Sequence, residues 1–95
     1  MVAIERVYEQ IAEFGEKYGA RRVLLFGSRA RGTNLPKSDI DLAVEGCPDF
    51  GALDDALQEG LWSLLRIDVV NLDDAISADL RAEIARDGKV LYEKV

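Results

Sequence analysis

The sequence contains no histidine and only one cysteine among its 95 residues. Without histidine there can be no Ser-His-Asp triad, no imidazole acid–base group and no histidine metal site. A single cysteine, Cys47, excludes an internal disulfide and a cysteine-based zinc cluster, so a reducing, cytoplasmic compartment is expected. No apolar run approaches the roughly 20 residues of a membrane span, and no signal-peptide pattern is present. The available chemistry is therefore that of carboxylates, hydroxyls, guanidinium groups and a hard cation.

Charge is spread unevenly along the chain, whose formal net charge is −6. Residues 21–37 hold five basic residues and no acidic one, whereas residues 38–95 hold fourteen acidic and five basic residues. Such an acidic chain is a poor binder of extended nucleic acid, because neutralisation of phosphates by Lys and Arg supplies most of that affinity. A short basic segment followed by carboxylates instead fits a small anion held beside a metal ion.

The periodicity of apolar residues predicts a single domain over residues 1–95 with alternating helices and strands. Helices are expected over 2–18, 50–60 and 77–87, a single helical turn over 28–32, and strands over 22–26, 39–45, 66–72 and 89–93. This order predicts an α/β (α+β) fold in which helices flank a small mixed β-sheet. In the loop that follows residue 60, Trp62, Leu64 and Leu65 are expected to be core or interface residues.

Gly27 and Ser28 follow the first predicted strand and precede the helical turn. Glycine allows a tight turn and a close approach to an anion, and the serine hydroxyl and nearby N–H groups can donate to phosphate oxygens. The segment is not a P-loop, because Thr33 rather than lysine follows Gly32. It is not a Rossmann fingerprint either, because Arg29 occupies the second glycine position. Taken alone, an ordinary strand-to-helix turn is the simpler explanation of this pair.

Three aspartates provide a second signal. Asp39 and Asp41 stand two residues apart on a predicted strand, which places both carboxylates on one face with Cα atoms about 7 Å apart. An EF-hand loop starting at Asp39 is excluded because Val44 replaces the required glycine. A lone pair of this kind is usually a solvated strand face, but Asp68 lies within another, otherwise apolar strand, where aspartate is disfavoured.

If those two strands are neighbours, the three carboxylates converge. Two unit charges about 4 Å apart repel by roughly 4 kcal/mol near a protein surface, so the cluster would need cations or protons. Oxygen ligands without histidine or cysteine favour Mg²⁺ or Mn²⁺ over zinc.

The combined pattern resembles a known family. Gly27-Ser28, ten residues and then Asp39-Ile40-Asp41 resembles the signature of the DNA polymerase β-like nucleotidyltransferases. The longer string, Gly27 to Gly32 and Ser38 to Leu42, is similar to the minimal nucleotidyltransferase (MNT) proteins of bacteria and archaea. The resemblance covers nearly the whole chain and implies a polymerase β-like nucleotidyltransferase core.

The resemblance also implies roles for individual residues. Asp39 and Asp41 would hold two Mg²⁺ ions, and Asp68 would complete the catalytic ion site and help to deprotonate the acceptor hydroxyl. Gly27 and Ser28 would grip the β- and γ-phosphates of ATP. Arg29 and Arg31 would stabilise the leaving pyrophosphate, although solvated surface arginines explain them equally well.

The function implied by the resemblance is transfer of AMP from ATP to a hydroxyl. Because the chain stops about where the catalytic core is complete, a partner is expected to supply the acceptor. In the MNT family that partner is typically a HEPN-domain toxin that is modified on tyrosine, which makes the MNT protein an antitoxin. Two alternatives stay open: an antitoxin that neutralises by binding alone, and a transferase that acts on a small molecule or an RNA end.

Overall fold

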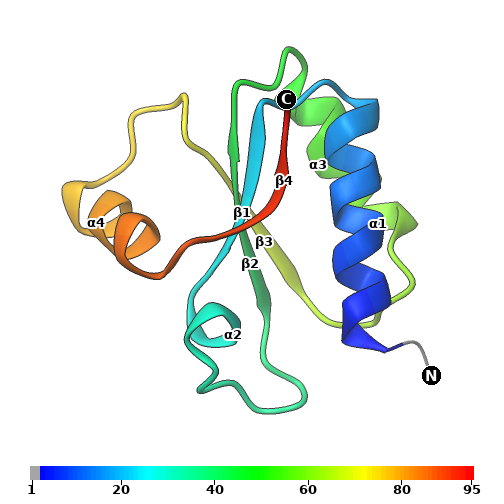
Figure 1. The fold of residues 1–95 in the computed structure, drawn as a ribbon, viewed down its shortest axis with the longest axis vertical. Helices are drawn as coiled ribbons and strands as arrows, with labels where there is room; N and C mark the ends of the chain where they lie inside the picture. Colours follow the sequence, from blue (N-terminus) through cyan, green and yellow to red (C-terminus); the bar gives the residue numbers. More distant parts are fainter. Residues whose placement is uncertain (1–2) are drawn as a thin grey trace.

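A mixed four-stranded sheet separates two layers of helices (Figure 1). The computed structural model describes residues 3–95. The elements, in chain order, are α1 (Ile4–Lys17), β1 (Arg22–Phe26), α2 (Ser28–Arg31), β2 (Ile40–Glu45), α3 (Phe50–Gly60), β3 (Ile67–Asn71), α4 (Ala78–Asp87) and β4 (Lys89–Glu93). The expected α+β architecture is confirmed.

The strands lie in the order β3-β2-β1-β4. β1 pairs antiparallel with both β2 and β4, whereas β2 and β3 are parallel. The parallel pair is joined through α3, as a crossover connection requires. In the resulting register Phe26 is opposite Asp41 on one side of β2, and Asp68 is opposite Asp41 on the other.

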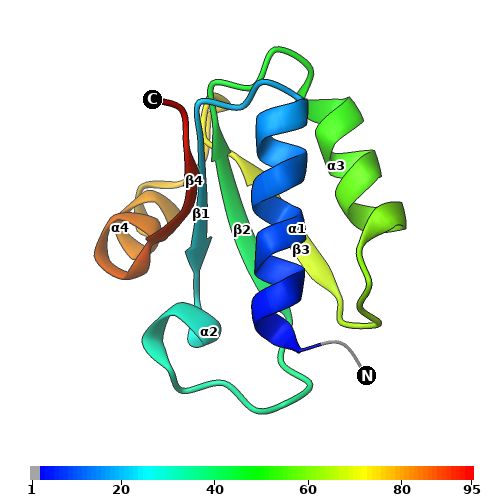
Figure 2. The ribbon, with the colours of Figure 1, turned by 45° about the vertical axis from the view of Figure 1, so that its right-hand side comes forward.

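Alternation along β2 explains why the sheet is buried on both faces. Ile40, Leu42 and Val44 belong to the larger core, which α1 and α3 cover. Ala43 belongs to a smaller core under Ile84 of α4. Figures 1 and 2 show this division, with α1 and α3 together on one side of the sheet and α4 alone on the other. Because side chains alternate along a strand, Asp41 shares the α4 face with Ala43, whereas Asp39 lies just before the strand begins.

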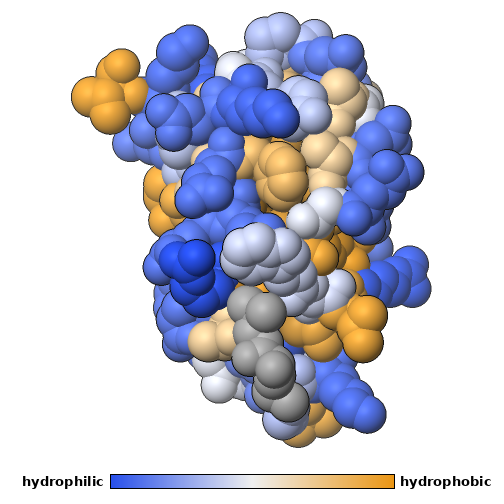
Figure 3. All heavy atoms as spheres, turned by 90° about the vertical axis from the view of Figure 1, so that its right-hand side faces the viewer, coloured by the Kyte–Doolittle hydropathy of each residue, from blue (hydrophilic) through white to orange (hydrophobic). Residues whose placement is uncertain are grey.

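Local signals account for the helices. In α1, Val7 and Ile11 are buried at helical spacing, and Figure 3 shows that hydrophilic side chains surround smaller apolar areas on this side of the molecule. The Asp49 carboxylate accepts the Ala52 N–H at 3.0 Å at the start of α3. The Ser77 hydroxyl accepts the Leu80 N–H at 3.1 Å and caps α4 as the sequence predicts.

The element bounds agree with the predicted ones to within one or two residues. The predicted start of the first helix at residue 2 lies outside the described residues. In the loop after α3, Leu65 packs against the larger core, whereas Trp62 is 59% exposed and Leu64 is fully exposed, so an interface role for these two stays a prediction. The pattern of apolar residues in a short loop does not predict which of its side chains are buried, because burial depends on what packs over the loop. Among residues 3–95, no helix is both long enough and apolar enough to cross a membrane.

Candidate active site

The end of β1 brings Gly27 against the carboxylate of Asp41. Gly27 has a φ of +75°, which other residues rarely adopt, and a Cβ at this position would collide with Asp41 Oδ2. The contact follows from the register, since Gly27 comes directly after Phe26, the partner of Asp41. The turn and the carboxylate strand, separated by more than ten residues of sequence, thus meet at one point.

Asp68 lies beside Asp41 on the neighbouring strand. The two residues are in register across the parallel pair β2–β3, so their backbones are about 4.8 Å apart. The condition set by the sequence, that the two carboxylate strands are neighbours, is therefore met. Asp68 Oδ1 also lies 3.4 Å from Arg66 Nε, an exposed ion pair at the start of the same strand.

Electrostatics link the three predicted aspartates. The pKa of Asp41 is raised above its usual value, first by burial and then by the negative charges of Asp68, Asp39 and Glu83. The positive charge of Arg31 acts in the opposite direction on the same pKa. Asp41 thus stands at the centre of a group of like charges, and Asp39 lies at its solvent-exposed edge.

The donor chemistry of this group fits a hard divalent cation. The side chains that would bind it are carboxylates, and the pKa of Asp41 is raised first by burial and then by neighbouring negative charges, whose repulsion a cation would relieve. In the described part of the chain, however, no three carboxylate, histidine or cysteine side chains are already grouped as a metal site. The carboxylates would therefore have to close around an incoming ion.

Arg29 is engaged with the loop that precedes β2. Its Nε donates to the Ser38 carbonyl at 3.0 Å, and its Nη2 donates to the Pro36 carbonyl at 3.1 Å. Both acceptors are backbone carbonyls, so these two contacts do not neutralise the positive charge of the guanidinium. They hold the loop that leads to Asp39. The arginine is neither a freely solvated residue nor one aimed only at a ligand.

Arg31 is engaged with α4 on the other side of the turn. Its Nη1 donates to Asp87 Oδ2 at 2.9 Å and lies 3.8 Å from Glu83 Oε1. Asp87 also accepts two hydrogen bonds from Arg86, both at 3.0 Å. These contacts lower the pKa of Asp87 to about 2, with the Arg86 hydrogen bond as the largest cause.

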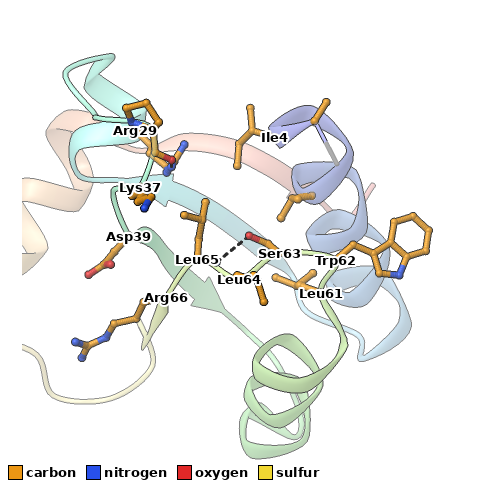
Figure 4. Close-up of a pocket in the computed structure, with 13 residues that line it drawn as sticks. Ile4, Arg29, Lys37, Asp39, Leu61, Trp62, Ser63, Leu64, Leu65 and Arg66 are labelled. Atoms are coloured by element: carbon orange, nitrogen blue, oxygen red, sulfur yellow. Dashed lines mark hydrogen bonds between the residues drawn. The ribbon is translucent and has the colours of Figure 1, made fainter. Parts of the chain in front are cut away.

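A groove of about 1260 Å³ opens beside the exposed edge of the site. Figure 4 shows Arg29, Lys37 and Asp39 on one side of it and the loop with Leu61 and Trp62 on the other. Most of the remaining lining is apolar and comes from the start of α1 and the same loop. The charged cluster therefore borders an open, largely apolar surface.

Comparison with known proteins assigns this arrangement. The sequence profile described as "Polymerase beta, Nucleotidyltransferase" matches residues 9–95. The chain belongs to this family. It is a nucleotidyltransferase, and the fold and family expected from the Gly-Ser and Asp-x-Asp pattern are confirmed. No curated protein matches the chain significantly.

Several solved structures resemble this nucleotidyltransferase. A candidate minimal nucleotidyltransferase is 30% identical, with a TM-score of 0.70 and 90% of each chain covered. A toxin–antitoxin structure with AMP-PNP is 26% identical, with a TM-score of 0.66 and coverage of 92% of this chain and 73% of the other. A third, the MNT antitoxin in complex with the tri-AMPylated Shewanella oneidensis HEPN toxin, shares the fold at 22% identity. Its TM-score is 0.63, with coverage of 97% of this chain and 74% of the other.

Two acidic residues near the site were not predicted. Glu83 and Asp87 are one helical turn apart in α4, and both contact Arg31 at the end of α2. Their spacing of four indicates a shared helix face, which the sequence does display. No local pattern shows that this face contacts α2, since Arg31 and Asp87 are 56 residues apart in the sequence.

Proposed function

We propose that this nucleotidyltransferase transfers AMP from ATP to a hydroxyl, and that the acceptor is a tyrosine of a HEPN-domain toxin for which the chain is the antitoxin. The observation that carries the proposal is the meeting of Gly27 with Asp41, because it joins a phosphate-type turn to a carboxylate cluster. The 26% identical toxin–antitoxin structure with AMP-PNP supports a nucleotide as the substrate. The AMPylated HEPN toxin in the Shewanella oneidensis complex supplies the acceptor class to test.

The protein groups have distinct tasks in this proposal. The Ser28 hydroxyl and the N–H groups around Gly27 would donate to the β- and γ-phosphates, and the lack of a Cβ at Gly27 lets the Asp41 carboxylate lie beside them. Arg31 would offset the negative charge that builds up on the departing pyrophosphate. Arg29 would contribute there through its charge while it holds the loop before Asp39.

The transfer balances as a single displacement at phosphorus. The acceptor oxygen forms a bond to the α-phosphorus of ATP, the bond from that phosphorus to the bridging oxygen breaks, and pyrophosphate leaves with the electron pair. The hydroxyl proton passes to a base, for which Asp68 is the candidate because it borders Asp41 at an accessible strand edge.

The residues that would hold Mg²⁺ are Asp39, Asp41 and Asp68. When bound, the ion supplies charge neutralisation and Lewis-acid polarisation of phosphate and hydroxyl oxygens. This matters because a tyrosine hydroxyl, with a pKa near 10, is a poor nucleophile at neutral pH.

Co-expression with a HEPN-domain toxin tests the proposal. The wild-type chain is expected to add one or more AMP units to the toxin, read by intact-mass spectrometry. Asp68→Ala is expected to keep the complex and lose the added mass. The matched control Asp55→Ala, which removes an exposed carboxylate from α3, should transfer AMP normally.

Other results would favour the alternatives. A toxin that is silenced by the wild-type chain but gains no mass indicates an antitoxin that acts by binding alone. Absence of a complex, together with AMP transfer to a small molecule or an RNA end, indicates a free-standing transferase.

A further inference from the structure

The short helix α2 is held by contacts in three directions. Arg29 donates to the loop before β2, and Ala30 is buried in the core beneath α1 and α3. Arg31 reaches the opposite side of the sheet and meets α4. Because α2 begins at the Gly27-Ser28 turn, whatever fixes these side chains also fixes the orientation of that turn.

Among the polar contacts of α2 described above, the hydrogen bond from Arg31 to Asp87 of α4 is the shortest and joins two charged groups. The Asp87 side chain is only 7% exposed, although it carries a charge and lies at the end of a helix. It accepts from Arg31 at 2.9 Å and from Arg86 at 3.0 Å. A nearly buried carboxylate with two arginine donors makes charge-assisted hydrogen bonds of the stronger kind. Glu83, one turn earlier, adds a second, looser acidic contact at 3.8 Å.

The Arg31 guanidinium contacts these two acids and also acts on the charge of Asp41 in the candidate site. Arg31 and Glu83 both act on the charge state of Asp41, which places them within electrostatic reach of the carboxylate cluster. The hydrogen bond and the ion pairs of Arg31 within residues 3–95 all use Nη1. Arginine has five N–H donors in a fixed planar fork, so Nε and Nη2 keep theirs for another acceptor.

We propose that Asp87, assisted by Glu83, is a positioning residue that holds Arg31 by Nη1 so that its remaining N–H groups can donate to the phosphate oxygens of a nucleoside triphosphate. This inference rests on the proposed function and names a residue outside the signature for the same site. A guanidinium already fixed by a buried carboxylate loses less side-chain freedom when a phosphate arrives. Asp87 thus acts through Arg31 and touches no substrate.

A double-mutant cycle tests the coupling. Affinity for AMP-PNP with Mg²⁺ is measured by calorimetry for the wild type, Asp87→Ala, Arg31→Gln and the double variant. Each single variant is expected to bind about tenfold more weakly, and the double variant no more weakly than Arg31→Gln alone. Arg86→Gln is the matched control, because it removes the other arginine on Asp87 and should change the affinity less than twofold.

A structural role for Asp87 would give a different pattern. If the two effects multiply in the double variant, or if Asp87→Ala binds like the wild type, the inference is overturned while the proposed function stands. If the wild type itself binds no AMP-PNP, the proposed function fails and the inference fails with it. Should circular dichroism show that Asp87→Ala is unfolded, Asp87→Asn, which keeps an acceptor oxygen and the side-chain volume, replaces it in the same cycle.

Discussion

Gly27 and Asp41 constrain one another at the scale of single residues. The positive φ of Gly27 and the lack of a Cβ allow the Asp41 carboxylate to lie directly against the turn. Asp41 in turn accepts partial burial beside other carboxylates, an arrangement that raises its pKa. A carboxylate whose pKa is raised by burial and by neighbouring charges is typical of a functional site.

The Asp41→Asn variant is expected to stabilise the metal-free fold and to abolish AMP transfer. With a folded-state pKa above the unfolded one, the ionised Asp41 destabilises the fold as pH rises past about 3.8, so neutral asparagine relieves the strain. The metal-free variant is expected to melt a few degrees higher than the wild type at pH 7, and this gain should shrink towards pH 3. AMP transfer should be lost, because an amide cannot replace a carboxylate ligand fully.

Melting curves without metal and transfer assays with Mg²⁺ check this prediction. Asp55→Asn, on the exposed side of α3, serves as the control and should change neither quantity. An Asp41→Asn protein that transfers AMP at the wild-type rate would show that Asp41 is no metal ligand.

At the scale of elements, α2 and α4 form a unit across the end of the sheet. A four-residue helix has too few hydrogen bonds to be stable alone, so α2 depends on its tertiary contacts. α4 in turn covers only a small core of four buried residues, Leu24, Phe26, Ala43 and Ile84. The contacts of Arg31 and Arg86 with Asp87 therefore tie two weakly supported elements together.

The link predicts a specific loss of stability in acid. Asp87 has a folded-state pKa of about 2 against an ordinary 3.8, so its stabilising contribution is complete above about pH 4 and is lost as pH falls towards 2. Asp87→Asn should lower the melting temperature at pH 6, and the difference from the wild type should vanish near pH 2. Melting curves of both proteins at pH 6, 4, 3 and 2 give the measurement. A difference that stays constant with pH would mean that the charge of Asp87 contributes nothing.

At the scale of the whole molecule, an acidic protein has to receive an acidic ligand. The chain carries a net charge of −6, and the site adds its own carboxylates to the charge of a triphosphate. Two like unit charges about 4 Å apart near a protein surface repel each other by roughly 4 kcal/mol. Nucleotide binding is therefore expected to depend on a cation that lies between the site carboxylates and the triphosphate.

Calorimetric titration of the isolated chain with ATP tests this dependence. We expect weak binding with Mg²⁺ and a loss of at least about tenfold in affinity when EDTA removes the metal, which corresponds to about 1.4 kcal/mol. Repeating the EDTA titration at high salt controls for general screening. Equal affinity with and without metal would contradict a metal-bridged site.

Local patterns in the sequence predict the elements, the fold class and the Gly-Ser and Asp-x-Asp motif. Helix periodicity, the Ser77 cap and the strand alternation of β2 act over a few residues, so they can be seen without a fold. The spacing of Gly27-Ser28 from Asp39 and Asp41 also lies within a short stretch, and it was enough to indicate the family that the comparison confirms.

Contacts between residues far apart in the sequence become visible in the folded chain alone. The parallel pairing of β2 and β3 places Asp68 beside Asp41, and the packing of α4 brings Asp87 to Arg31. Both contacts join segments that are more than 25 residues apart, so the spacing of residues within one segment cannot predict them. The same holds for Trp62, which is mostly exposed because burial depends on what packs over a residue, and its predicted interface role stays a prediction.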